Sequence, residues 1–141
     1  MQLILRQPAA RDEQDDPNGV VVAASPDTLG REQWLWDIRM TASASNYDVI
    51  VSHNADVIDA EQERVHLASE LRRQRDEHEL WIAVAVSGPV RHGIFELEPG
   101  DVAVWEGDDP LSIHLLPVDA SAEIDLIRIS RRDGRAARWV P

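Results

Sequence analysis

The sequence predicts an all-β fold, an antiparallel barrel or sandwich that forms a single domain over residues 1–141. Three observations support this prediction. Between Leu80 and Ile129, short apolar segments alternate with tight turns made of Gly, Pro or Asp. No helix-length pattern separates these segments. The chain also has the length of one ordinary domain, which suffices for one buried core.

The N-terminal part is predicted to contain two short strands. Residues 3–5 form the first, and a polar stretch follows over 11–18. Pro17-Asn18-Gly19 indicates a turn, because Asn and Gly both tolerate a positive φ. The turn leads into an apolar strand over 20–24, which ends at Ser25-Pro26-Asp27.

Two further strands are predicted over 34–40 and 47–52. In the first, large apolar side chains alternate with Asp37 and Arg39. In the second, Asp48 and Ile50 share the less apolar side. The alternation assigns the other side to the core, with Trp34, Trp36, Ile38, Met40, Tyr47, Val49 and Val51.

The segment 59–79 fits two patterns. Val65, Ala68 and Leu71 form a narrow helical stripe, whereas Val65, Leu67 and Leu71 fit a period of two. Periodicity alone does not separate helix from strand in so short a segment. We favour a strand over about 64–71, followed by a charged loop.

The C-terminal half is the clearest part of the sequence. Residues 80–86 are apolar on both faces, as in a strand that is covered on both sides. Turns are expected at 89–93, at Pro99-Gly100-Asp101 and at 107–110, with strands over 102–105, 111–116 and 124–130. Gly100 is expected to need a positive φ. Asp133-Gly134 is expected to close a last hairpin with 136–140.

Composition excludes several classes of partner. The net charge of −12 comes from 26 acidic residues and 14 basic ones, and such a field repels nucleic acid. No apolar run reaches the length that crosses a membrane, and the N-terminus lacks the pattern of a signal peptide. The chain has no cysteine, so it has no disulfide and no thiolate metal site. We expect a cytoplasmic protein without a membrane or nucleic-acid partner.

The turns of the C-terminal half resemble those of the cupins. Gly88, Pro99-Gly100-Asp101 and Gly107 stand where cupins have a strand-ending Gly, a Pro-Gly-Asp turn and a second Gly-bounded turn. Within the cupins, the HutD/Ves family is most similar, a family linked to histidine utilisation in bacteria. Residues 17–19 resemble the Asn-Gly-Gly segment of this family, and residues 36–39 resemble its Trp-Arg-x-Ser strand. Residues 47–50 resemble its Asp-Phe-Asn strand, with a shifted and partial match.

The resemblance implies one cupin-like β-barrel or jelly roll over 1–141 and a role near histidine or amino-acid degradation. The chain departs from the family in length. The family carries a Phe-Ser turn and a Gly-Arg segment between its Trp strand and its Asp strand, and neither is present here. A ligand site built from those family segments is therefore not carried over.

The metal site that many cupins carry is not expected. That site needs a His-x-His motif, and the chain has none. His92 and Glu96 have only a distant likeness to the motif, and Leu111 stands where the second motif places a His. His114 comes three residues later. We expect no metal, no cofactor and no nucleophilic catalysis, and we interpret Glu96, Glu98 and Asp101 as a solvated turn.

A ligand site is sought among the polar and aromatic strand residues. If Arg39 faces the interior, its guanidinium can bind a carboxylate in a bidentate manner while Asp48 accepts an amide or hydroxyl. Strand alternation favours solvent for this pair, because Trp36 and Ile38 belong to the core. Trp81 and Trp105 lie opposite the main aliphatic faces of their strands. The candidate ligand-binding residues are Trp36, Arg39, Asp48, Trp81, Trp105 and His114.

These features favour non-catalytic, regulatory binding of a small polar metabolite by a homodimer. Two alternatives stay open. One is a metal-dependent cupin enzyme, an isomerase or dioxygenase. The other is a protein-interaction module that uses its Trp-bearing sheet faces.

Overall fold

The computed structural model describes residues 2–4, 19–24, 36–43 and 46–138. These residues form strands and turns without any helix, and every strand pairing is antiparallel. The prediction of an antiparallel all-β fold is therefore confirmed.

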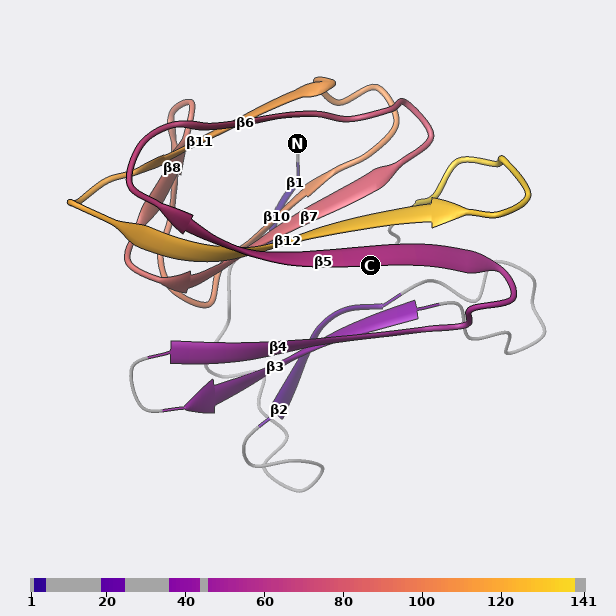
Figure 1. The fold of residues 1–141 in the computed structure, drawn as a ribbon, viewed down its shortest axis with the longest axis horizontal. Helices are drawn as coiled ribbons and strands as arrows, with labels where there is room; N and C mark the ends of the chain where they lie inside the picture. Colours follow the sequence, from indigo (N-terminus) through magenta and orange to yellow (C-terminus); the bar gives the residue numbers. More distant parts are fainter. Residues whose placement is uncertain (1, 5–18, 25–35, 44–45, 139–141) are drawn as a thin grey trace.

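The strands form three sheets (Figure 1). The five-stranded sheet has the order β1 (Gln2–Ile4), β10 (Val102–Trp105), β7 (Leu80–Ser87), β12 (Ala122–Arg131) and β5 (Ile58–Leu67). The four-stranded sheet has the order β6 (Leu71–Gln74), β11 (Ser112–Pro117), β8 (Val90–His92) and β9 (Phe95–Leu97). The three-stranded sheet has the order β2 (Gly19–Ala24), β3 (Trp36–Ser43) and β4 (Asn46–His53).

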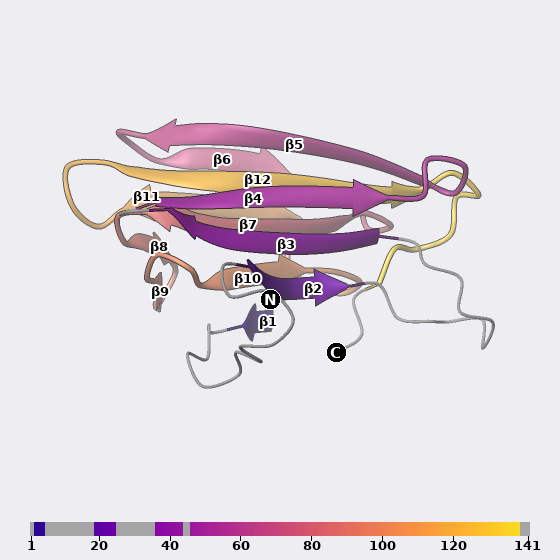
Figure 2. The ribbon, with the colours of Figure 1, turned by 90° about the horizontal axis from the view of Figure 1, so that it is seen from below.

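The five-stranded sheet lies between the other two sheets and contributes to two cores. One core joins β7, β10 and β12 to β3 and β4, and it contains Trp36, Ile38 and Ile82. The other core joins the same three strands to β8, β9 and β11, and it contains Trp105 and Ile113. Figure 2 shows β3, β4, β5, β7 and β12 running along the same long axis.

Strand β7 confirms the prediction of a strand that is covered on both sides. All its residues from Leu80 to Val86 are buried. Leu80 and Ile82 belong to the first core, whereas Trp81 and Ala83 belong to the second. Because side chains alternate across a strand, an apolar run is stable here only with a layer on each face.

None of the three sheets closes on itself among the described residues, since each strand order has two ends. The closed barrel or jelly roll therefore stays a prediction. No described segment is a helix long and apolar enough to cross a membrane.

The segment 59–79 contains strands, as favoured, but its predicted bounds are wrong. Strand β5 begins at Ile58, and it pairs with β12 along its whole length. A turn over 68–70 follows, and β6 lies where a charged loop was expected. The error has a physical cause: β5 is an edge strand whose buried residues, Ile58 and Leu67, stand only at its ends. The charged residues between them hide the period of two.

The expected turn at Gly100 is confirmed. Gly100 has a φ of 96°, and its N–H donates to the carbonyl oxygen of Ala85 at 2.8 Å. The Asp101 carboxylate accepts a hydrogen bond from the backbone N–H of Glu98 at 2.9 Å, which fixes the turn.

Two other predicted features are wrong. The turn expected over 89–93 contains strand β8, and the chain reverses at Gly93 and Ile94. The hairpin expected after Asp133-Gly134 does not form over 136–138. Instead, the N–H of Ala137 donates to the carbonyl oxygen of His78 at 2.9 Å, and the Ala137 side chain joins the first core. Strands β1 and β2 confirm the two N-terminal strands. The predictions at 17–18, 25–27, Trp34 and 139–140 fall outside the described residues.

Candidate functional site

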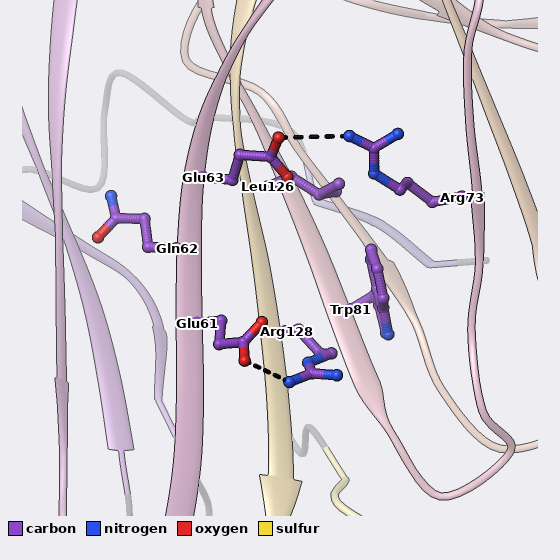
Figure 3. A pocket seen from close by; sticks show the side chains of 7 residues that line it. All are labelled: Glu61, Gln62, Glu63, Arg73, Trp81, Leu126 and Arg128. Atoms are coloured by element: carbon purple, nitrogen blue, oxygen red, sulfur yellow. Dashed lines mark hydrogen bonds and ion pairs between the residues drawn. The ribbon is translucent and has the colours of Figure 1, made fainter.

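A pocket of about 260 Å³ opens where one face of the five-stranded sheet meets strand β6 (Figure 3). Its walls come from β5, β6, β7 and β12. The residues that line it are Glu61, Gln62, Glu63, Arg73, Trp81, Leu126 and Arg128.

Strand register brings these residues together. Across the sheet, Glu61 lies opposite Arg128, and Arg128 lies opposite Trp81. Glu63 lies opposite Leu126 in the same way. Directly opposed residues of antiparallel strands present their side chains on the same face. The pocket face is therefore set by the pairing of β5, β12 and β7, whose residues are far apart in the sequence.

The side of the pocket next to β12 and β7 contains a chain of charged contacts. Arg128 Nη2 contacts Glu61 Oε1 at 2.6 Å, and Arg128 Nε lies 3.4 Å from Glu79 Oε2. The same Glu79 oxygen accepts a hydrogen bond from the indole N–H of Trp81 at 3.3 Å. The indole nitrogen of Trp81 therefore has a hydrogen-bond partner, while the rest of the ring forms an apolar wall of the pocket.

Strand β6 supplies the second cation of the pocket. Arg73 Nη2 lies 3.3 Å from Glu63 Oε1, and Arg73 Nη1 donates to the carbonyl oxygen of Arg72 at 3.1 Å. The Arg73 side chain is 35% exposed and that of Glu63 is 57% exposed. This pair lies near the solvent and is longer than a tight charge-assisted hydrogen bond.

Charges of opposite sign meet in the lining as two ion pairs, Glu61 with Arg128 and Glu63 with Arg73. Figure 3 shows the carboxylates of Glu61 and Glu63 along β5, facing the guanidinium groups of Arg73 and Arg128. The surface between them is apolar, formed by Leu126, which is 3% exposed, and by Trp81. The arrangement can pair both charges of a small polar molecule and cover its apolar part.

Gln62 points away from the other lining residues in Figure 3. Its amide nitrogen donates to the carbonyl oxygen of Val49 at 2.9 Å and to the carboxylate of Asp125 at 3.3 Å. Asp125 is buried and also accepts hydrogen bonds from Arg64. The hydrogen bond between Arg64 and Asp125 is the main cause of the raised pKa of Arg64. This second polar cluster connects β5 and β12 to β4 and is a structural feature.

The residues predicted from the sequence lie in separate places. Trp81 lines the pocket, whereas Trp36 is buried in the first core and Trp105 in the second. Asp48 is exposed on β4. Arg39 lies on β3 and pairs with Ile50 of β4, which is two residues from Asp48 in the sequence.

His114 lies outside the pocket as well. Its Nδ1 donates to Glu70 Oε1 at 3.1 Å, and its side chain is 44% exposed. The pKa of Glu70 is lowered, chiefly by the hydrogen bond from Arg72. Of the six predicted ligand residues, the pocket contains only Trp81.

The charged lining of the pocket was missed from the sequence. Glu61 and Glu63 alternate along β5, and Arg128 interrupts the apolar strand over 124–130. A lone arginine in an apolar strand was the available signal. It gave no information on which carboxylates would lie opposite, because that depends on pairing between residues far apart in the chain.

The described residues contain no group of three or more His, Asp or Glu side chains that is arranged to hold a metal. His92 donates from Nδ1 to the carbonyl oxygen of His114 at 2.8 Å. Its ring meets Trp105 edge-on, with the ring centroids 5.2 Å apart.

The chain has no match among protein-family models, curated proteins or solved structures.

Proposed function

We propose that the protein binds a small polar metabolite in the pocket between β5, β6, β7 and β12, without transforming it. The observation that carries the proposal is the convergence of Arg73, Arg128 and Trp81 on one pocket. Its volume of about 260 Å³ lies just below the usual range for drug-sized ligands, so it suits a smaller molecule.

The pocket retains capacity for a ligand. Arg128 contacts Glu79 through Nε and Glu61 through Nη2, which leaves the two N–H groups of Nη1 available within the described part of the chain. Guanidinium groups recognise carboxylates with fixed geometry, and the aromatic wall adds contact area. The three side chains therefore supply both specificity and buried surface.

We further propose that the fold is a cupin-like barrel or jelly roll similar to that of the HutD/Ves family. The three turn glycines of the resemblance support it, because each has a positive φ: 73° at Gly88, 96° at Gly100 and 53° at Gly107. On this proposal, the protein has a regulatory role near amino-acid utilisation, as the resemblance implies.

The test is a panel of common carboxylates, amines, amino acids and sugars, each added at millimolar concentration. Melting temperature and tryptophan fluorescence are recorded for the wild-type protein. A ligand that binds the pocket raises the melting temperature by mass action, and Arg128→Ala abolishes the rise. Arg91→Ala is the matched control, since Arg91 is exposed on β8 and does not line the pocket.

Arg39→Ala separates this pocket from the site predicted around Arg39 and Asp48. Loss of binding in Arg39→Ala, with binding retained in Arg128→Ala, would place the ligand at the other site. The proposal is wrong if no compound in the panel changes either signal.

An interaction module is the second candidate, and one observation favours it. The β8–β9 hairpin exposes Ile94 at 94% and Phe95 at 42%. If these side chains hold the expected homodimer together, light scattering will show a dimer that Ile94→Asp converts to a monomer. A wild-type monomer at high micromolar concentration would rule this out.

A further inference from the structure

We propose that the ligand is a zwitterion of the α-amino-acid class with an apolar side chain. Its ammonium group lies along β5, and its carboxylate lies against Arg73 and Arg128. This inference depends on the proposed function, because it names the ligand class for the same pocket.

The ammonium side is formed by Glu61 and Glu63. They are two residues apart on one face of β5, which places their Cα atoms about 7 Å apart. Their side chains are 66% and 57% exposed, so each keeps oxygens open to a ligand. An ammonium group has three donors and can be shared by two such carboxylates.

The carboxylate side is formed by Arg73 and Arg128, which reach the pocket from β6 and β12. The contact between Arg73 and Glu63 is 3.3 Å long and that between Arg128 and Glu79 is 3.4 Å long, whereas Arg128 Nη2 contacts Glu61 at 2.6 Å. The two longer contacts are the weaker ones. A ligand carboxylate can replace a protein carboxylate in such a contact. In the exchange at Arg73, the ligand ammonium group takes the place of the guanidinium beside Glu63, so both of these protein charges stay paired. Glu79, displaced from Arg128, keeps the hydrogen bond from the indole N–H of Trp81.

Net charge separates a zwitterion from simpler ligands. A simple anion is repelled by the protein's net charge of −12 and meets three carboxylates near the pocket: Glu61, Glu63 and Glu79. A simple amine leaves Arg73 and Arg128 without a new partner. A zwitterion carries no net charge and contributes one group to each side.

The apolar surface of the pocket determines which kind of side chain the ligand carries. Leu126 and Trp81 are 3% and 9% exposed, and they line the pocket together. A branched aliphatic side chain that covers them gains apolar contact without needing a further polar partner.

The experiment compares three probes that share the isobutyl side chain of leucine. L-Leucine carries both charged groups, 4-methylpentanoate lacks the ammonium group, and 3-methylbutan-1-amine lacks the carboxylate. Binding is followed by calorimetry and by tryptophan fluorescence, with Trp81→Phe to show that the optical signal arises in the pocket. Each truncated probe is expected to bind at least about tenfold more weakly than L-leucine, because each loses charge-assisted hydrogen bonds.

Variants test the orientation. The double variant Glu61→Gln, Glu63→Gln should weaken L-leucine strongly and 4-methylpentanoate little, or even improve the latter. Arg73→Gln should weaken L-leucine and 4-methylpentanoate but not the amine. Arg91→Gln should change none of the three affinities.

The outcomes distinguish this inference from the proposed function. If either truncated probe binds as tightly as L-leucine, the zwitterion assignment is wrong and pocket binding stands. If all three probes fail while a panel metabolite outside the α-amino-acid class binds with dependence on Arg128, the zwitterion assignment is wrong and pocket binding again stands. If no metabolite binds at all, both proposals are wrong.

Discussion

The Nη2 atom of Arg75 donates a hydrogen bond to the carbonyl oxygen of Gly107 at 2.8 Å, across 32 positions of sequence. Arg75 is 1% exposed and also donates to the backbone carbonyls of Asp76, Glu79 and Asp109. One buried guanidinium therefore fastens the β6–β7 loop to the β10–β11 loop. The β6–β7 loop carries Glu79, which contacts Arg128 and Trp81 at the pocket.

Arg75→Ala is expected to lower the free energy of unfolding by roughly 3–5 kcal/mol, because it leaves several carbonyl groups without donors inside a loop junction. Arg75→Lys should recover only part of this loss, since an ammonium group cannot reproduce the planar fork. Urea denaturation of both variants measures the effect, with the exposed Arg91→Ala as the control. An Arg75→Ala protein as stable as the wild type would mean that solvent replaces the guanidinium without cost.

Gly100→Val is expected to destabilise the protein by roughly 1–3 kcal/mol, because a β-branched residue strongly disfavours a φ of 96°. Gly100→Ala should cost less than Gly100→Val, since alanine is not branched at Cβ. The denaturation midpoints of the two variants are the measurement. Equal midpoints for wild type and Gly100→Val would show that the turn can adopt another conformation.

Glu98→Gln is expected to make the protein more stable at neutral pH and to have little effect in acid. Desolvation raises the pKa of Glu98 above its ordinary value of 4.5, and the nearby Glu96, Asp101 and Asp119 raise it further. A raised carboxyl pKa in the folded state contributes stability below the ordinary value, and this contribution is lost as the pH rises through the folded value.

The check is the difference in melting temperature between Glu98→Gln and wild type at several pH values. The difference should be near zero below the ordinary pKa of Glu98 and should become positive as the pH rises through the folded value. Added salt should shrink it, because the contribution of the neighbouring carboxylates is screened. A difference that is constant with pH would contradict the interpretation.

Divalent metals are expected to leave the melting temperature unchanged. The described residues offer no group of three metal-ligating side chains, and the sequence contains no His-x-His motif. Micromolar Mn²⁺, Fe²⁺, Ni²⁺ and Zn²⁺ are added in turn to chelator-treated protein. A rise of several degrees with one metal would favour the alternative of a metal-dependent enzyme, because binding to the native state stabilises it.

The sequence predicted the fold where a local pattern determined the structure. The apolar run over 80–86 requires a covered strand, and the Pro99-Gly100-Asp101 turn requires a residue with positive φ. Strand β5 was less predictable, because ten residues of pairing with β12 stabilise a segment whose own composition is charged. Local propensity is weak beside pairing of that length.

The pocket was beyond local patterns for the same reason. Glu61 and Arg128 meet because their strands pair in one particular register. Arg73 reaches Glu63 of the same pocket because the chain leaves the five-stranded sheet after Leu67. A shift of one residue in that register would turn Glu61 and Glu63 to the opposite face. Trp81 was predictable because its strand was.

The alternation of β7 between two cores has a consequence for how the molecule unfolds. Trp81 and Ile82 are covalent neighbours, yet each belongs to a different core. Neither core can melt while the other keeps β7 in place. We therefore expect one cooperative transition rather than two, with β7 amides among the slowest to exchange with deuterium. Local fluctuations beside the pocket are then expected at β5 and β6, the two edge strands that line it.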